Sequence, residues 1–484
     1  MNPPVLSQYY YYWYRLKQSK MFAYALAGLV QVLVFVDEFV RLSTHHQSRL
    51  PFVMDIFTLC TIEFVFLLIF HRVFDVLLRR QPYLPRFLAT QLAMLGAMTC
   101  LLPSDWLHQG VALVVIHTCA YMNVLTMGIA PALAIVLMST ALFWLVGHMP
   151  ALHSMVCAET AMVALLAFGR PSQVRSRSAF WNPALAVTSV LFIQYVLTTG
   201  NLQTDWHVWL ITLGTYSIWS LLSIAFALVL LPFIEQVFGY LTPFRLLELA
   251  NMDHPLLKQL QVDAPGTFHH SLVLASLSEA AADTIGANGL LARVGCLYHD
   301  IGKMKRPTYF VENQSYYGMN NPHDELSPRL SKAVVVAHPR DGQQMADEHR
   351  LPEGIKAFMP EHHGTLLCGY FYFKAVKEEG KANVCETEFR YPGPKPQSRE
   401  TAIVMMADAC ESAVRALKNP TPVEIEALVG KLFQQRVDDG QLDECPLTLA
   451  ELNTIKQTFI KMLFAINHQR VNYSEKIKAI RPSN

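Results

Sequence analysis

Long apolar segments fill the first half of the chain, and shorter amphipathic patterns replace them in the second half. A helix that spans the hydrocarbon core of a bilayer needs about 20 predominantly apolar residues. Eight segments approach this length, although the two between residues 109 and 147 are nearly continuous. They cover residues 21–42, 52–71, 87–103, 109–126, 127–147, 152–169, 179–199 and 208–233. The pattern predicts a polytopic transmembrane helical bundle of about seven to eight spans in residues 1–234.

The charged residues divide the chain at the same place. Residues 1–240 contain 21 Lys, Arg, Asp and Glu, whereas residues 241–484 contain 56, as expected for a soluble domain. Loops after odd-numbered spans carry little basic charge apart from Arg41 and Arg49. Loops after even-numbered spans carry Arg72, Arg79, Arg80, Arg86, Arg170, Arg175 and Arg177. The positive-inside bias therefore predicts that the N-terminus and everything after residue 234 lie in the cytoplasm.

The second half, residues 235–484, shows helical rather than strand patterns. An apolar stripe (Phe244, Leu246, Leu247, Leu249 and Leu257) predicts a connecting helix, interrupted around Asn251, Asp253 and Pro255. Further helices are expected from the turn at Pro265–Gly266 to Gly286, across residues 326–349, and across residues 401–417. Because alternating strand patterns are almost absent, we expect an all-α domain.

The segment 306–328 is long and irregular for a compact domain. Such segments are usually functional lids or disordered. Its four aromatic residues favour an ordered lid; they are Tyr309, Phe310, Tyr316 and Tyr317.

Charge and cysteine content exclude two classes of protein. A net charge of +1 gives no attraction to nucleic acid, so neither DNA nor RNA is expected as a partner. The nine cysteines are scattered, without a Cys-x-x-Cys pair, which argues against a disulfide scaffold and a structural zinc site.

One ordered subset of the histidines and aspartates of the second half has the character of a metal site. Imidazole and carboxylate groups suit iron, manganese or zinc. Five histidines and two aspartates exceed the needs of one tetrahedral ion, but they suit two ions that share a bridging carboxylate. An adjacent His–Asp pair on a helix can serve this purpose, with the His on one ion and the Asp on both. The candidate ligands are His270, His299, Asp300, His338, His362, His363 and Asp408.

These residues lie in stretches that resemble the HD-domain phosphohydrolases. His270, the pair His299–Asp300 and Asp408 match the H…HD…D signature of that helical superfamily. The wider pattern resembles the seven-transmembrane HD family, the PgpH-type cyclic di-AMP phosphodiesterases. The matching stretches, between about residues 230 and 450, are APGTFHHS, YHDIGK, ENQ…NPHDELSP, AHPRDG, HHGT and FRYPGPKPQ. Members of that family carry a large extracellular domain after the first span, and here residues 43–51 occupy its place.

The resemblance implies a ligand set for each of two divalent transition-metal ions, manganese or iron. One ion is held by His270, His299, Asp300 and Asp408. The other is held by Asp300, His338, His362 and His363. His270 is preferred to His269 because the family's ligand is the histidine directly before the serine.

The implied reaction is hydrolysis of cyclic di-AMP to linear pApA by a water that the two ions share and activate. Asp300 is therefore a catalytic residue as well as a ligand. Lys303, one turn beyond it, is a second catalytic candidate that can neutralise a phosphate oxygen or the leaving group. An equally good interpretation of Lys303 is a solvated lysine at a helix end. Arg415 is a weaker phosphate candidate.

Two alternative functions stay open at the level of sequence. One is a non-catalytic membrane receptor whose HD domain binds a cyclic dinucleotide. The other is a phosphodiesterase for another cyclic dinucleotide such as cyclic di-GMP, although the Gly-Tyr-Pro signature of the related HD-GYP enzymes is missing after His363. The expected location is the bacterial inner membrane, as a multi-pass protein in the lipid bilayer with a cytoplasmic HD domain. A homo-oligomer is left open.

Overall fold

A computed structural model describes residues 206–238, 241–417 and 420–467, together with Val114, Thr118, Tyr121 and Met122. Apart from these four residues, the first seven predicted spans lie outside the described residues, as do residues 43–51. The chain divides into two compact units, Met1–Pro243 and Phe244–Asn484.

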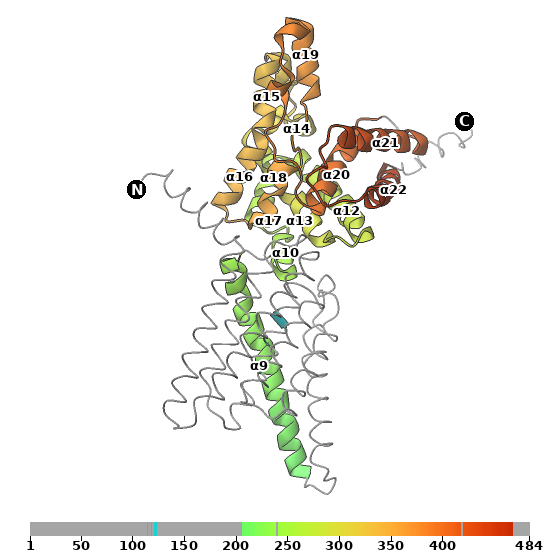
Figure 1. The fold of residues 1–484 in the computed structure, drawn as a ribbon. Coiled ribbons are helices and arrows are strands. Elements are labelled where there is room, and N and C mark those ends of the chain that lie inside the picture. Colours follow the sequence, from blue (N-terminus) through green and yellow to red (C-terminus); the bar gives the residue numbers. More distant parts are fainter. Residues whose placement is uncertain are drawn as a thin grey trace, which may run out of the picture. The chain divides into compact units, whose positions relative to one another are not determined.

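The described part of the first unit is dominated by one long helix, α9 (Trp206–Phe238), drawn in green in Figure 1. It contains a segment, Trp206–Phe233, that is long and apolar enough to cross a membrane, and it is the one such helix among the described residues. Large apolar side chains such as Ile211 and Val229 are exposed on it. The segment coincides with the eighth predicted span, 208–233.

From Pro243 onward, the described residues form helices and connecting loops, with one isolated antiparallel bridge between Leu367 and Arg390. The all-α prediction is therefore confirmed for this part. The α-helices are α10 (Pro243–Leu249), α11 (Pro255–Asp263), α12 (Pro265–Thr284), α13 (Gly289–Tyr298), α14 (Val311–Tyr317), α15 (Pro328–Val336), α16 (His338–Glu348), α17 (Glu353–Lys356), α18 (Phe358–Glu361), α19 (Gly369–Glu379), α20 (Arg399–Arg415), α21 (Pro422–Asp438) and α22 (Leu449–Asn467). The 3-10 helices are η2 (Ile301–Lys305), η3 (Pro307–Tyr309), η4 (Pro322–Asp324), η5 (Lys381–Asn383) and η6 (Glu386–Phe389).

Local sequence signals set where these helices begin. Proline occupies the first position of α11, α12, α15 and α21, where its missing N–H costs no helical hydrogen bond. The Asn288 side chain caps α13 by accepting a hydrogen bond from the Leu291 N–H. Reciprocal capping boxes start α20 at Ser398 and α21 at Thr421. The predicted interruption near Pro255 is confirmed as the gap between α10 and α11.

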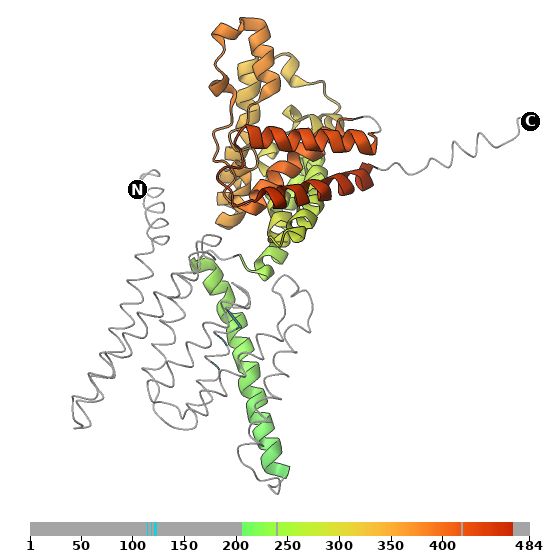
Figure 2. The same ribbon diagram turned by 45° about the vertical axis from the view of Figure 1, so that its right-hand side comes forward.

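Helix α12 is central to the second unit and packs against α13, α20 and α22. Its side chains Leu274 and Leu277 are fully buried, as are Ile403 on α20 and Ile455 on α22. Both views show α21 and α22 side by side at one flank and α15 with α19 projecting at another (Figures 1 and 2). The inner surface formed by α12, α13, α18 and α20 holds most of the candidate ligands.

Two predicted helical runs break at candidate ligands. Residues 326–349 form two helices, α15 and α16, rather than one, because Pro339 lacks the N–H that would continue the helix through His338. The pair His299–Asp300 was expected to lie within a helix, and the structure shows that it does not. His299 ends α13, and Asp300 precedes the tighter turn of η2. Each break places a ligand at a helix junction, where its side chain turns inward.

The predicted lid, residues 306–328, is ordered and built from η3, α14 and η4. Asn313 is fully buried and bonds Thr267 at the start of α12 twice, accepting from its N–H at 3.1 Å and donating to its hydroxyl at 2.9 Å. The Tyr317 hydroxyl donates to the Asp263 carbonyl at 2.6 Å. The prediction that this segment is ordered is therefore confirmed, and its role as a lid stays a prediction.

A close contact joins η2 to the start of α16. A Cβ atom at Gly302 would lie 2.0 Å from the His338 carbonyl oxygen, so only glycine fits there. One turn along α16, the buried Asp341 carboxylate binds Lys305 at 3.2 Å and Arg306 at 2.8 Å. These contacts fix the Asp300 segment against His338.

Candidate metal centre

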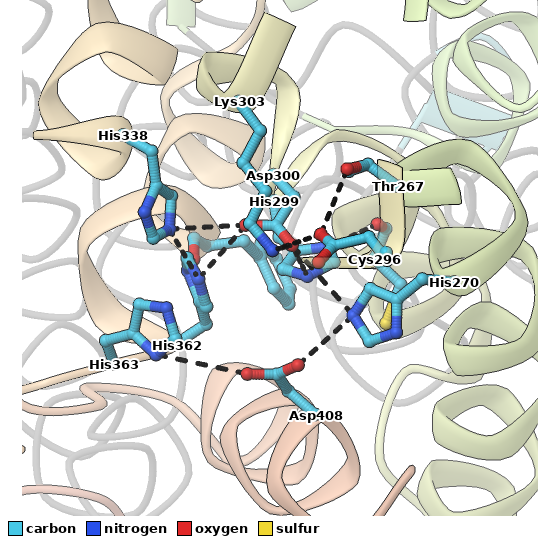
Figure 3. Close-up of polar contacts among 12 residues, drawn as sticks. Thr267, His270, Cys296, His299, Asp300, Lys303, His338, His362, His363 and Asp408 are labelled. Carbon is cyan, nitrogen blue, oxygen red and sulfur yellow. Dashed lines mark hydrogen bonds and ion pairs between the residues drawn. The ribbon is translucent and has the colours of Figure 1, made fainter. Parts of the chain in front are cut away.

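The seven predicted ligands converge around one space in the second unit (Figure 3). They arrive from five places in the chain that are up to 138 residues apart, and all but two are more than nine-tenths buried. We divide them into half-site A (His270, His299 and Asp408) and half-site B (His338, His362 and His363). In each half-site, one ligand atom from each of the three residues lies within 4.8 Å of the others.

Half-site A joins three helical elements. His270 comes from α12, His299 from the end of α13 and Asp408 from the middle of α20. The His270 Nε2 atom lies 3.1 Å from Asp408 Oδ1. The neighbouring His269 is exposed, so the α12 backbone directs His270, and not His269, into the site.

Half-site B is a cluster of three imidazoles. The Nε2 atoms of His338 and His362 lie 3.4 Å apart. The His363 ring is tilted against the His362 ring, with ring centroids 4.0 Å apart, and its centroid lies 5.0 Å from that of the His338 ring. Helix α18 ends at Glu361, which leaves the tandem histidines at its C-terminal end.

Asp300 lies between the two half-sites. Its Oδ2 atom lies 3.1 Å from His299 Nε2 and 3.9 Å from His270 Nε2 in half-site A. Its Oδ1 atom lies 3.2 Å from His338 Nε2 and 3.6 Å from His362 Nε2 in half-site B. One carboxylate thus presents one oxygen to each group, which is the arrangement of a bridging ligand.

Hydrogen bonds on the far side of the rings orient four of the five histidines. His299, His338 and His362 direct Nδ1 at the backbone carbonyls of Cys296, Val335 and Phe358, at 2.6, 2.7 and 2.9 Å. His270 directs Nδ1 at the Glu411 carboxylate at 2.7 Å. Because a carbonyl only accepts, Nδ1 carries the proton in the first three rings, and a neutral ring then has its lone pair on the inward-facing Nε2.

This arrangement fits a metal. Within the described residues, the buried atoms His299 Nε2 and Asp300 Oδ1 have no hydrogen bond of acceptable geometry. The Nε2 lone pairs of neutral His338 and His362 face each other and Asp300, an electrostatic conflict that a cation between them removes. Burial lowers the pKa of His338, and burial with the adjacent His362 holds the pKa of His363 well below its usual value. Both rings are therefore neutral at neutral pH, as metal ligation requires.

Charge in half-site A follows a different pattern. Burial opposes protonation of His270, but its hydrogen bonds with Asp408 and Glu411 raise its pKa to about 10. Burial disfavours the Asp408 charge, yet His270 holds the pKa of Asp408 well below its usual value. Half-site A without metal is thus a proton-bridged ion pair, and metal binding there displaces the proton.

The candidate catalytic residue Lys303 contacts Asp300 directly. Its Nζ atom lies 2.8 Å from Asp300 Oδ2 and 2.8 Å from Glu312 Oε1, and it lies over the Phe310 ring at 5.0 Å. Burial opposes its charge, but the two carboxylates raise the pKa of Lys303 above its usual value. The interpretation as a solvated lysine is wrong, because this side chain is largely buried between the metal centre and the lid.

Glu411 is a site residue that the sequence reasoning missed. It lies one helical turn after Asp408 on α20 and is 6% exposed. The sequence contained a signal for it, because Glu411 is an acidic residue three positions after Asp408, and a helix places two such residues on the same face. Its other oxygen lies 3.4 Å from Arg415 Nη1. Arg415 therefore pairs with Glu411, with 43% of its side chain exposed.

Comparison with known proteins agrees with this geometry. The model of the HD domain family matches residues 267–413, which include all seven predicted ligands. Residues 267–413 of this chain are therefore similar to the HD domain family. The cyclic-di-AMP phosphodiesterase PgpH of Bacillus subtilis (strain 168) is 50% identical over 252 residues, which are 52% of this chain and 35% of that protein. Its namesake from Listeria monocytogenes (serotype 1/2a, strain 10403S) is 41% identical over 321 residues, 66% of this chain and 44% of the relative.

A crystal structure of the L. monocytogenes PgpH HD domain in complex with cyclic-di-AMP is 46% identical in sequence. It matches 46% of this chain and 100% of that chain, with a TM-score of 0.43. The present chain spans less than half the length of the two PgpH relatives. The predicted resemblance to the PgpH-type family is confirmed.

Proposed function

We propose that this chain is a dimetal phosphodiesterase that hydrolyses cyclic di-AMP to linear pApA. The observation that supports the reaction type is the Asp300 carboxylate, which presents one oxygen to each of two ligand clusters. The similarity to two PgpH proteins named as cyclic-di-AMP phosphodiesterases supports the substrate.

The donor set favours manganese or iron as the two ions. Half-site A with Asp300 would hold one ion, and half-site B with Asp300 would hold the other. When bound, two such ions supply a water of lowered pKa as the nucleophile and positive charge beside the phosphate. Asp300 sets the spacing of the two ligand clusters, and Lys303 and the backbone contacts hold that carboxylate in place.

We propose two roles for Lys303: it holds the Asp300 carboxylate in place, and it adds a positive charge to the site. Its ammonium group is 2.8 Å from each of two carboxylates, so it adds one positive charge beside the reacting phosphate. Glu312 belongs to lid helix α14, so the same ammonium group connects the metal centre to the lid. A phosphate oxygen that approaches the site meets this charge at low dielectric.

The proposed location is the bacterial inner membrane, with a transmembrane bundle in residues 1–234 and a cytoplasmic HD domain in residues 235–484. The apolar helix Trp206–Phe233 supports membrane insertion, as does the division of charge along the sequence. The Arg-rich loops after even-numbered spans support the orientation.

The test is hydrolysis of cyclic di-AMP by the full chain in detergent, loaded with manganese and monitored by chromatography for pApA. Asp300→Asn keeps the shape of the side chain but removes the charge that both ions need, so we expect a loss of at least about 1,000-fold in rate. Asp253→Asn is the matched control, because Asp253 is exposed and pairs only with Lys258 among the described residues. Full activity of the Asp300 variant would refute the bridging role.

The receptor alternative predicts a different result in the same preparation. A chain that binds two metal ions and cyclic di-AMP but releases no pApA would be a binding protein rather than an enzyme. Parallel reactions with cyclic di-GMP separate the remaining alternative, because faster cleavage of that dinucleotide would reassign the substrate.

A further inference from the structure

His363 differs from the other four histidines of the centre in how its ring is held. Each of the others has an Nδ1 hydrogen bond to a carbonyl or carboxylate. Within the described part of the chain, neither ring nitrogen of His363 forms a hydrogen bond, and the nearest carboxylate oxygen is Asp408 Oδ2 at 3.9 Å from its Nδ1. Ligands that lack such a partner lose the usual means by which ring orientation is fixed.

A tyrosine ring packs against the face of the His363 imidazole. The Tyr391 ring lies over the His363 ring in a tilted arrangement, with centroids 4.3 Å apart and an interplanar angle of 31°. It also meets the His338 ring edge-on at 6.3 Å. The Cys368 thiol contacts the Tyr391 hydroxyl. Within the described residues, Tyr391 therefore packs against two of the three imidazoles of half-site B and against no ring of half-site A.

The backbone around Tyr391 is tied to the segment that follows His363. The Tyr391 N–H donates to the Leu366 carbonyl at 2.9 Å, beside the bridge between Leu367 and Arg390. The Arg390 guanidinium donates to the Thr365 carbonyl at 2.9 Å. Gly364 has φ +52° and makes the turn between the ligand and this bridge. The two rings are thus held together by a short, rigid frame.

A second anchor fixes the frame to helix α21. Gln441, which is fully buried, accepts from the Thr365 N–H at 2.9 Å and donates to its hydroxyl at 2.9 Å. Arg390 forms two hydrogen bonds to the Asp439 carboxylate, at 2.9 and 3.1 Å. The position of Tyr391 against His363 is therefore set by the C-terminal end of α21, from outside the residues that bear ligands.

The two half-sites also differ in charge. Half-site A has its own carboxylate, Asp408, with Glu411 behind His270, in addition to the shared Asp300. Half-site B has three imidazoles and no carboxylate of its own; within the described residues, the nearby oxygens are Asp300 Oδ1, at 3.2 and 3.6 Å, and Asp408 Oδ2, at 3.9 Å from His363 Nδ1. A divalent cation is attracted more strongly by the site with more negative charge.

We propose that Tyr391 is a positioning residue that orients His363 by ring packing, and that half-site B, which depends on it, binds metal more weakly than half-site A. This inference rests on the two-ion centre of the proposed function, but it does not depend on the substrate. Because half-site B has the weaker affinity, its occupancy limits assembly of the two-ion centre as the metal concentration rises.

The experiment is a titration of the metal-free full chain in detergent with Mn²⁺, with free Mn²⁺ read from its electron paramagnetic resonance signal. The wild-type chain is expected to show one tighter and one weaker ion. Tyr391→Leu should weaken the weaker class by about 10–100-fold, the effect of losing an outer-shell partner, and leave the tighter class unchanged. Tyr391→Phe keeps the ring and should stay within about threefold of the wild type.

Tyr370→Leu is the matched control, because Tyr370 is 70% exposed on α19 and should leave both classes unchanged. Circular dichroism of the metal-free chains checks folding, and Tyr391→Met replaces the Leu variant if that variant does not fold. Unchanged binding in both the Leu and Met variants would overturn the proposal, as would an equal loss in the Phe and Leu variants. Two equal classes in the wild type would overturn the unequal affinity. Because no dinucleotide is present, failure of hydrolysis with normal metal binding would count against the proposed function alone.

Discussion

Replacement of Glu411 gives the sharpest test of how half-site A holds its ion. The Glu411 carboxylate is 6% exposed and lies 2.7 Å from His270 Nδ1, so it fixes both the ring angle and the tautomer of that histidine. Glu411→Gln keeps an acceptor oxygen but removes the charge, and Glu411→Ala removes both. Loss of an outer-shell partner costs about 10–100-fold in metal affinity. We therefore expect about tenfold for the Gln variant and about 100-fold for the Ala variant.

These factors correspond to about 1.4 and about 2.7 kcal/mol of binding free energy. The Ala variant should in addition lower the free energy of unfolding of the metal-free chain by about 1–3 kcal/mol, since the buried His270 would lose its partner. A competition titration against a chromogenic chelator measures the affinity, and urea unfolding measures the stability.

Glu426→Gln on α21 serves as the control, because Glu426 is exposed and distant in sequence from the ligands. The tighter class of ions should weaken in the Glu411 variants, whereas the weaker class should respond to Tyr391. If the tighter class kept its wild-type affinity in both Glu411 variants, His270 would not bind metal through Nε2 and the ligand assignment of half-site A would be wrong.

Three further predictions concern the frame around the centre. Gly302→Ala should abolish binding of the weaker ion, because the added Cβ would lie 2.0 Å from the backbone carbonyl that begins α16; a metal titration checks this. Asp341→Asn breaks the ion pairs of a buried carboxylate with Lys305 and Arg306, and it should lower the free energy of unfolding in urea by about 1–3 kcal/mol. Asp347 is exposed on the same helix, so Asp347→Asn should change this free energy by less than about 0.5 kcal/mol. Arg390 holds the pKa of Asp439 below its usual value, so this pair contributes stability above about pH 4. That stability is lost as the pH falls through the lowered pKa. The free energies of unfolding of the wild-type and Asp439→Asn chains should therefore converge at acid pH.

The sequence predicted correctly those features that depend on residues within a single helix or at its boundary. The helical pattern of residues 401–417 correctly placed Asp408 on a helix, and the Pro255 signal correctly separated two helices. The adjacent pair His299–Asp300 was correctly expected in one centre, but its helical setting was wrong. Its actual setting, a junction between α13 and a 3-10 turn, depends on the close packing of Gly302 against α16, a contact between distant segments.

The residues that escaped sequence reasoning act through contacts rather than through spacing. Glu411 could have been found, since it shares a helix face with Asp408. Tyr391 could not, because its position beside His363 follows from a two-residue bridge and from anchors just after the end of α21, which no local pattern encodes.

This difference bears on how the metal centre is assembled. The ligands of half-site A lie on or at the end of three helices of the core, α12, α13 and α20, which pack directly against one another. Their geometry is therefore as stable as the core itself. Two of the three ligands of half-site B follow the short helix α18, and His363 depends on a loop contact. Local opening occurs at lower free energy in such segments than in packed core helices. Half-site B is consequently the part of the centre where a change in the loop can alter metal binding without unfolding the domain. Substitutions of Tyr391 in the loop should therefore weaken a different class of bound ion from substitutions of Glu411 in the core.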